Sequence, residues 1–138
     1  MTTMTLDTPA SVPGSSLSRW AGRTLTGLAT AFLAFDAAIK LLRLEMVAQS
    51  ARELGYPPET MFGTGLVLLA CLIVHLVPRT AILGAVLLTG YLGGAIATHV
   101  RVGNPLLSHV LFPIYVAALI WGGLYLRDAR VRALLAPR

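Results

Sequence analysis

The stretch AILGAVLLTGYLGGAIATHV, residues 81–100, contains no lysine, arginine, aspartate or glutamate. A helix of about 20 apolar residues is long enough to cross a hydrocarbon core roughly 30 Å thick, so this stretch predicts a membrane span. Three further apolar blocks of similar length occupy residues 21–42, 58–77 and 105–126. A transmembrane barrel would instead show alternating strands of about ten residues. The pattern therefore predicts an all-α integral membrane protein, a four-helix antiparallel bundle.

Composition supports this interpretation and sets the domain organisation. Of the 138 residues, 56% are hydrophobic and 12% charged, against about 45–50% and about 25% in a typical soluble domain. Residues 1–18 are rich in threonine, serine, proline and glycine, which predicts a disordered cytoplasmic tail. Residues 19–132 form one four-span domain, and residues 133–138 a basic C-terminal tail.

The formal net charge of +5 could indicate a nucleic-acid partner in a soluble protein, but here the arginines flank the spans. With four spans, both termini and the joint near residue 79 share one side of the membrane. That side carries Arg19, Arg23, Arg79, Arg127, Arg130, Arg132 and Arg138. The opposite side carries Arg43, Arg52 and Arg101, with Lys40 near its edge. The excess of positive charge predicts cytoplasmic termini, with the lipid bilayer and no nucleic acid as partner.

The first span contains FDAAIKLLR, residues 35–43, which places three charges in an apolar helix. Asp36, Lys40 and Arg43 are separated by four and then three residues, so they share one helix face. Asp36 and Lys40 have the acid-first spacing that pairs best. One interpretation is an ion pair that packs inside the bundle, and the other is a site facing a cavity. The sequence leaves both open.

The topology predicts a polar cluster on the side away from the termini. Antiparallel crossing brings together the end of span one, the start of span two, the end of span three and the start of span four. The candidate ligand-binding residues there are Asp36, Lys40, Glu59, His99, Arg101, Asn104 and His109. Apolar walls with a few convergent polar groups suit a small amphiphile such as a quinone or a lipid. We expect no metal site, because two histidines and scattered carboxylates do not make a zinc or haem pattern.

Other segments give more local predictions. Residues 43–59, RLEMVAQSARELGYPPE, are amphipathic and predict a short helix on the membrane surface. Gly90 and Gly94 form a GxxxG spacing, which favours packing against a neighbouring helix of the same chain, with homodimerisation as the alternative. Pro113 is expected inside the fourth helix and His75 at the membrane interface. The single cysteine and the lack of phosphate-loop, nucleophile-elbow or HExxH motifs leave the catalytic residues unknown.

Several short motifs together carry a family resemblance. They are Asp36 and Lys40, LGYP at 54–57, PRT at 78–80, ATHVRVGNP at 97–105 and LYLRD at 124–128. Over about residues 24–132 the chain resembles the DoxX-like family of small bacterial membrane proteins. The resemblance implies a four-helix protein of the bacterial inner membrane. The family's name comes from a relation to a subunit associated with thiosulfate:quinone oxidoreduction, and some relatives are linked to membrane redox complexes.

Three functions follow as hypotheses. The first is a non-catalytic protein that binds a quinone, a lipid or a partner subunit in the polar pocket. The second is a subunit of a quinone-linked oxidoreductase, with Asp36, His99 or His109 relaying protons. The third is a small proton-coupled transporter, which is less favoured because Lys40 would compete with a cationic substrate for Asp36. The sequence leaves open whether the chain is an enzyme.

Overall fold

The computed structural model describes residues 15–137, and every regular element in that range is a helix. The elements in chain order are α1 (Ser16–Leu41), α2 (Glu45–Glu53), α3 (Thr60–Leu76), α4 (Ala81–Arg101), the π-helix η1 (Leu106–Val110), α5 (Phe112–Arg127) and α6 (Ala129–Leu135). The all-α prediction is therefore confirmed. Most of the predicted N-terminal tail, residues 1–14, lies outside the described residues, as does residue 138.

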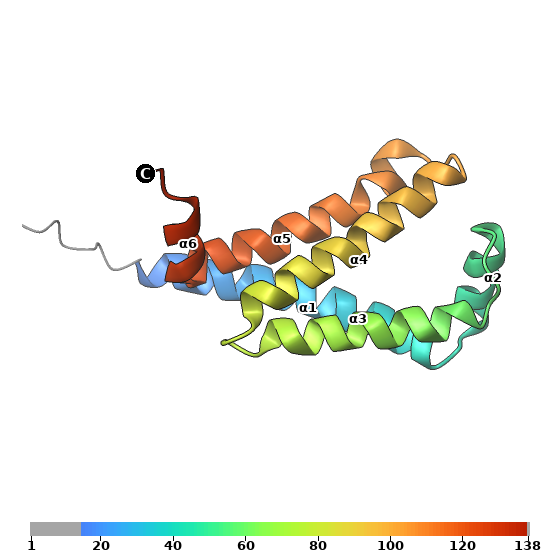
Figure 1. Ribbon diagram of the computed structural model, residues 1–138, viewed down its shortest axis with the longest axis horizontal. Helices are drawn as coiled ribbons and strands as arrows, with labels where there is room; N and C mark the ends of the chain where they lie inside the picture. The colour runs from blue at the N-terminus through green and yellow to red at the C-terminus, as the bar shows by residue number, and fades with distance from the viewer. Residues whose placement is uncertain (1–14, 138) are drawn as a thin grey trace, which may run out of the picture.

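The four long helical segments run antiparallel along the long axis of the molecule (Figure 1). The start of α1, the α3–α4 joint and α6 lie at one end, here named the termini end, and α2 lies at the other, the α2 end. α1, α4 and the segment Leu106–Arg127 are long and apolar enough to cross a membrane, and α3 is a shorter apolar helix of 17 residues. These helices form the membrane bundle that the four apolar blocks predict.

The helix ends differ from the predicted ranges by a few residues, for local reasons. The Ser15 side chain accepts a hydrogen bond from the Ser18 backbone N–H, so α1 begins at Ser16, before the predicted domain boundary at residue 19. α3 begins at Thr60 because Pro57 and Pro58 occupy the turn that precedes it. At the C-terminus, α6 extends through Leu135 into the predicted tail.

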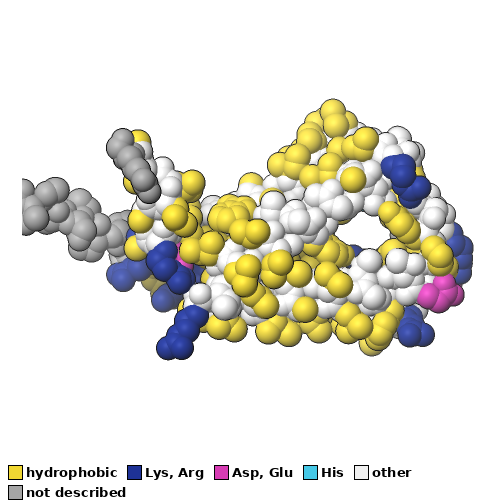
Figure 2. Space-filling view, viewed as in Figure 1, with side chains coloured by type: hydrophobic (Ala, Val, Ile, Leu, Met, Phe, Trp, Pro, Cys, Tyr) yellow, Lys and Arg dark blue, Asp and Glu magenta, His cyan; other side chains and the backbone are white. Residues whose placement is uncertain are grey.

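The interior is apolar, and so is most of the outside. Leu33, Leu68, Leu88, Ile120 and Leu124 are buried, one or more from each long helix. Many large hydrophobic side chains are exposed on the flanks, while lysine and arginine lie mainly near the two ends (Figure 2). An apolar flank between charged ends is the arrangement expected of a protein surrounded by lipid.

Glycines allow close helix crossings at the termini end. A Cβ on Gly22 of α1 would lie 2.9 Å from the carbonyl oxygen of Gly123 in α5. A Cβ on Gly84 of α4 would overlap the backbone of His75 in α3. His75 lies in the last turn of α3, is 1% exposed, and has its Nδ1 2.9 Å from the Ala81 carbonyl oxygen. It is therefore buried in the bundle at the termini end, and its place at the membrane interface stays a prediction. The close crossing at Gly84 buries it.

The α2 end is open by contrast. α4 diverges from α3 toward this end (Figure 1). A Cβ on Gly90 or Gly94 would meet no atom within 4 Å, so the predicted packing of this GxxxG pair against a helix of the same chain is wrong. Both glycines line a cavity instead.

The fourth span is also broken near its start. The π-helix η1 covers Leu106–Val110, and α5 begins at Phe112, which places Pro113 in the first turn of α5 rather than in a helix interior. Proline is tolerated in a first turn because no intrahelical partner is needed for a backbone N–H there. π-helical turns are rare and are found frequently at functional sites.

Candidate functional site

A cavity of about 430 Å³ opens between α3 and α4 at the α2 end. Figure 2 shows the hollow between these two sides of the molecule. Its α4 wall includes Gly90, Tyr91, Gly94 and Thr98, and the loop between α2 and α3 closes one side through Leu54 and Tyr56. The predicted residues Lys40 and His99 both line it. The topology argument therefore brought these two residues to the same end of the bundle.

The Asp36–Lys40 ion pair forms as the spacing predicts. The Lys40 side chain is 16% exposed and that of Asp36 is 26% exposed. Lys40 Nζ also donates to the Tyr91 hydroxyl at 2.9 Å, which joins α1 to α4 across the cavity. An ammonium group carries three N–H donors, so these two acceptors leave one donor of Lys40 without a partner among residues 15–137.

The close approach of α1 and α3 positions Lys40. A Cβ on Gly65 of α3 would lie 2.9 Å from Lys40 Cβ and 3.4 Å from the Ala37 carbonyl oxygen. Glycine at position 65 lets the two backbones come together, and the Lys40 stem then runs from the α1–α3 contact to Tyr91. The sequence analysis missed Tyr91. Tyr91 could have been found from its place in a span without charged residues. A tyrosine hydroxyl buried there needs a hydrogen-bond partner from another helix.

A second polar group joins the end of α4 to η1. Asn104 Nδ2 lies 2.7 Å from His99 Nδ1, and the His99 and His109 ring centroids are 5.5 Å apart. Because an amide nitrogen can only donate, His99 Nδ1 accepts, and Nε2 is then the protonated nitrogen of the neutral ring. The Asn104 side chain orients His99 and makes no cap for η1. His109 is exposed and lies 2.8 Å, through Nδ1, from Ser108 Oγ.

Arg101 closes the rim of the cavity. It donates to the Leu54 carbonyl oxygen and stacks over the Tyr56 ring at 5.2 Å. The Tyr56 hydroxyl lies 3.2 Å from Thr98 Oγ1. These contacts tie the α2–α3 loop to the end of α4, so Arg101 has a structural part in forming the cavity wall.

The profile of the DoxX-like family matches residues 24–123, which include α1 through most of α5. The chain belongs to the DoxX-like family. No curated protein and no solved structure matched it. The match covers every helix that lines the cavity, and with the apolar helices it identifies a DoxX-like membrane protein.

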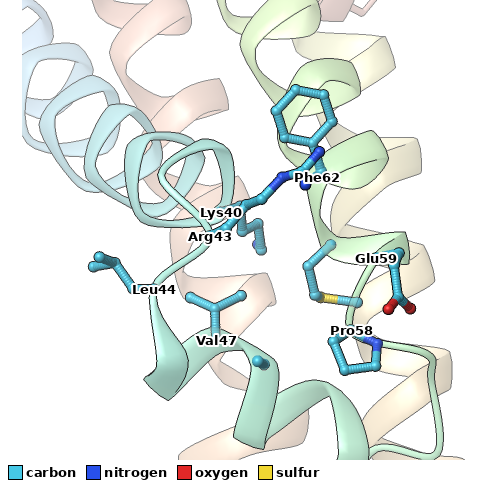
Figure 3. Close-up of a pocket in the computed structure, with 9 residues that line it drawn as sticks. Lys40, Arg43, Leu44, Val47, Pro58, Glu59 and Phe62 are labelled. Atoms are coloured by element: carbon cyan, nitrogen blue, oxygen red, sulfur yellow. The ribbon is translucent and has the colours of Figure 1, made fainter.

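Glu59 lies apart from the main cavity of this DoxX-like protein. It lines a smaller pocket of about 200 Å³ between the end of α1, α2 and the start of α3. Figure 3 shows Arg43 extending toward Phe62 there, with Glu59 and Pro58 on the α3 side. The Arg43 guanidinium lies 4.6 Å from the centre of the Phe62 ring. Lys40 lines both pockets and connects them.

The predicted residues thus fall into distinct positions in the DoxX-like fold. Lys40 and His99 line the cavity, Asp36 and Asn104 orient them, and Arg101 holds the rim. Within residues 15–137 no group of three or more histidine, cysteine, aspartate or glutamate side chains could hold a metal ion. The arrangement places the hydrogen-bonding groups of Lys40 and His99 in a mainly apolar cleft, where they can contact a small molecule.

Proposed function

We propose that this DoxX-like protein binds a small amphiphile in the cavity at the α2 end, and that its headgroup is neutral and accepts hydrogen bonds. Quinones are the class that fits best. The observation that supports this is the unpartnered donor of Lys40 beside Tyr91 in a cavity of about 430 Å³. That volume lies within the roughly 300–1,000 Å³ range of small-molecule sites.

The charge of the cavity favours a quinone over an anionic lipid. Asp36 neutralises Lys40, so the pair offers hydrogen bonding without net charge. A quinone has two carbonyl oxygens, and Lys40 and His99 supply donors from opposite walls. The open surface at Gly90 and Gly94 gives an isoprenoid tail an apolar path from the cavity toward lipid.

The distribution of arginine supports an orientation for the site. The termini end carries Arg19, Arg23, Arg79, Arg127, Arg130 and Arg132 among the described residues. We propose that this end faces the cytoplasm of a bacterial inner membrane. The quinone site then opens in the outer leaflet. Cysteine-labelling of single introduced cysteines at positions 79 and 103 in intact cells tests this orientation.

The binding test uses a short-chain ubiquinone and equilibrium dialysis with the purified protein in detergent. Gly94→Leu places a side chain in the cavity, and we expect binding to weaken about tenfold or more. Gly93→Leu is the matched control, because Gly93 is equally open but does not line the cavity. Tyr91→Phe removes the hydroxyl that accepts from Lys40 and should weaken binding severalfold. Equal binding by Gly94→Leu and Gly93→Leu would exclude the cavity as the quinone site.

A second candidate function is a membrane subunit of a quinone-linked oxidoreductase. The observation that favours it is the pair His99 and His109, whose rings lie 5.5 Å apart between the cavity and the exposed surface. Reduction of a quinone to a quinol takes two electrons and two protons, and these imidazoles could pass the protons while a partner dehydrogenase supplies the electrons. Co-purification of a dehydrogenase whose quinone reductase activity falls on His109→Ala would support this function. If the purified protein binds quinone and no dehydrogenase co-purifies with it, the oxidoreductase function is excluded.

The open glycine face also bears on oligomeric state. If Gly90 and Gly94 pack against a second copy instead of an isoprenoid tail, Gly94→Leu should convert a dimer to a monomer in native mass spectrometry. A chain that is monomeric before and after the substitution excludes this homo-oligomer.

A further inference from the structure

A separate cleft of about 380 Å³ lies at the termini end, distant from the quinone site. It is lined by α1 residues, by Leu76 at the end of α3 and by Arg127 at the end of α5. Two arginines, Arg23 and Arg127, line it together with the hydroxyl side chains of Thr26 and Thr30. The lining contains no acidic side chain among the described residues.

The two arginines of this cleft make fewer contacts with protein acceptors than the arginines of α6. In the described part of the chain neither Arg23 nor Arg127 forms an ion pair. Arg130 pairs with Asp128 and donates to the Pro78 carbonyl, and Arg132 donates to the carbonyls of Tyr125 and Leu126. The α6 guanidinium groups therefore donate to several protein acceptors, whereas among the described residues Arg127 donates to one and Arg23 to none.

Local contacts hold the cleft donors in place. Arg127 Nε donates to Thr26 Oγ1 at 3.1 Å, which fixes the guanidinium and leaves its terminal nitrogens free of protein acceptors. The Arg23 guanidinium lies 5.6 Å from the centre of the Trp20 ring. One turn beyond Thr26, Thr30 Oγ1 is buried without a hydrogen-bond partner. A buried hydroxyl without a partner is costly.

We propose that this cleft binds the phosphate of an anionic phospholipid from the leaflet at the termini end. Guanidinium groups are suited to phosphate because their N–H donors match its oxygens in bidentate geometry. The cleft is open at its side, and Gly27 and Ala31 leave an apolar surface along α1 for an acyl chain. A half-buried arginine at the membrane edge gains a counter-ion in this way.

The same interaction would join two helices. The phosphate would contact Arg23 on α1 and Arg127 on α5, beside the end of α3. A lipid bound there stabilises the closed end of the bundle, from which α3 and α4 diverge toward the quinone cavity. The proposal requires the two cleft arginines in particular, and not only a general attraction between basic residues and anionic headgroups.

Native mass spectrometry of the full chain released from nanodiscs tests the proposal. The nanodiscs contain phosphatidylglycerol and phosphatidylcholine with matched acyl chains. We expect the protein to retain one phosphatidylglycerol, and the double variant Arg23→Gln/Arg127→Gln to lose this preference by about tenfold. Arg79→Gln removes an arginine from the same end but not from the cleft, and should retain the lipid. An equal loss in Arg79→Gln would overturn the proposal, since it would indicate general electrostatics.

A second variant tests the cleft without removing charge. Gly27→Leu fills the cleft, and because a Cβ there meets no atom within 4 Å, the bundle should still fold. We expect Gly27→Leu to lose the bound lipid, whereas Gly63→Leu, equally open but outside the cleft, should keep it. Retention of phosphatidylglycerol by Gly27→Leu would overturn the proposal, because the lipid would then be bound outside the cleft.

Discussion

The helix α4 uses glycine in opposite ways near its two ends. At the termini end, Gly22, Gly84 and Gly123 lie where a Cβ would contact the neighbouring helix. At the α2 end, Gly90 and Gly94 lie where a Cβ would meet open space, and they line the cavity. One helix, α4, contains both kinds, six residues apart between Gly84 and Gly90. The helix pair α3–α4 is thus closed at one end and open at the other.

This difference separates two effects of a small residue in a membrane helix. It can allow two backbones to approach, as GxxxG motifs do in helix pairs, or it can leave open volume beside the helix. The crossing at Gly84 fixes α4 against α3, and the divergence beyond it creates the cavity. The predictions below test this division, from the largest expected effect to the smallest.

Gly84→Ala should give the largest loss of stability. Its Cβ would overlap the backbone of His75, which is not a flexible group that can move aside. Overpacking of this kind costs about 1–3 kcal/mol and sometimes more, and here it would also disturb the bond from His75 to the Ala81 carbonyl. We expect a loss of about 3 kcal/mol, measured by denaturant unfolding in mild detergent.

Gly123→Ala gives a comparison at the same end of the bundle. Its Cβ would lie 2.5 Å from Thr26 Oγ1, which is a side-chain atom and not a backbone atom. The Thr26 hydroxyl can rotate, so we expect a smaller loss than for Gly84→Ala. Unfolding curves for Gly84→Ala that match those of the unsubstituted protein would contradict the closed crossing.

The sequence predicted the bundle but not the difference between its ends. Apolar blocks of about 20 residues give the spans directly, because lipid allows few other structures. The GxxxG pattern, however, states only that a close approach is permitted. Whether Gly90 and Gly94 meet a helix depends on where α4 crosses α3, and that crossing is set by Gly84 and His75. Non-local packing of this kind leaves no periodic signal in one sequence.

The candidate site was predictable in part for a related reason. The i,i+4 spacing of Asp36 and Lys40 is local, so the ion pair could be foreseen. Antiparallel topology also brought His99 to the same end as Lys40. Tyr91 was missed because its partner Lys40 lies 51 residues away in the chain. Glu59 lines a different pocket, between the end of α1, α2 and the start of α3.

Lys40→Met tests the bond that crosses the open end. It leaves Asp36 without its cation in a half-buried position inside the bundle. Removing one partner of a fully buried pair costs about 3–5 kcal/mol, and the partial exposure of Asp36 reduces our expectation to about 2 kcal/mol. Unfolding in detergent at neutral pH measures the loss.

The double variant Asp36→Leu/Lys40→Met provides the control for this prediction. It removes both charges, and most of the lost stability should return, because no unpaired charge remains. If the double variant is as unstable as Lys40→Met alone, the loss comes from the Tyr91 bond or from packing, and the ion pair is not the main contribution.

Asp128→Asn tests how α6 closes the termini end. Hydrogen bonds from the Arg130 side chain are the main reason that the pKa of the Asp128 carboxyl lies below its ordinary value, and its Oδ1 caps α6 by accepting from the Arg130 backbone N–H at 2.9 Å. A lowered pKa in the folded state stabilises the protein above the unfolded pKa of about 3.9, and that contribution is lost as the pH falls through the folded value.

Asparagine keeps a capping oxygen, so Asp128→Asn removes mainly the charge and its ion pair with Arg130. We therefore expect it to cost at most about 1 kcal/mol at pH 7, and less at pH 3 because the contribution is lost as the pH falls. Thermal unfolding at the two pH values measures the difference. A cost that is independent of pH would mean that the charge of Asp128 contributes nothing to stability.

Gly94→Ala should have the smallest effect on stability and the opposite sign. Alanine is favoured over glycine in a helix interior by about 0.5–1 kcal/mol, and the added Cβ meets no atom within 4 Å. The substitution that is most harmful at Gly84 should therefore stabilise α4 slightly at Gly94. Gly93→Ala should give the same gain, since Gly93 is equally open.

The two variants then separate stability from binding. Because Gly94 lines the cavity and Gly93 does not, only Gly94→Ala should weaken the binding of the short-chain ubiquinone, by about two- to threefold for one methyl group. If the added methyl group stabilises α4 but lowers the affinity for ubiquinone, the open volume at Gly94 serves ligand binding at a small cost in stability. If Gly94→Ala destabilises the chain as Gly84→Ala does, then α4 meets another helix at Gly94, as it would in a homodimer, and the volume there is an interface between two copies.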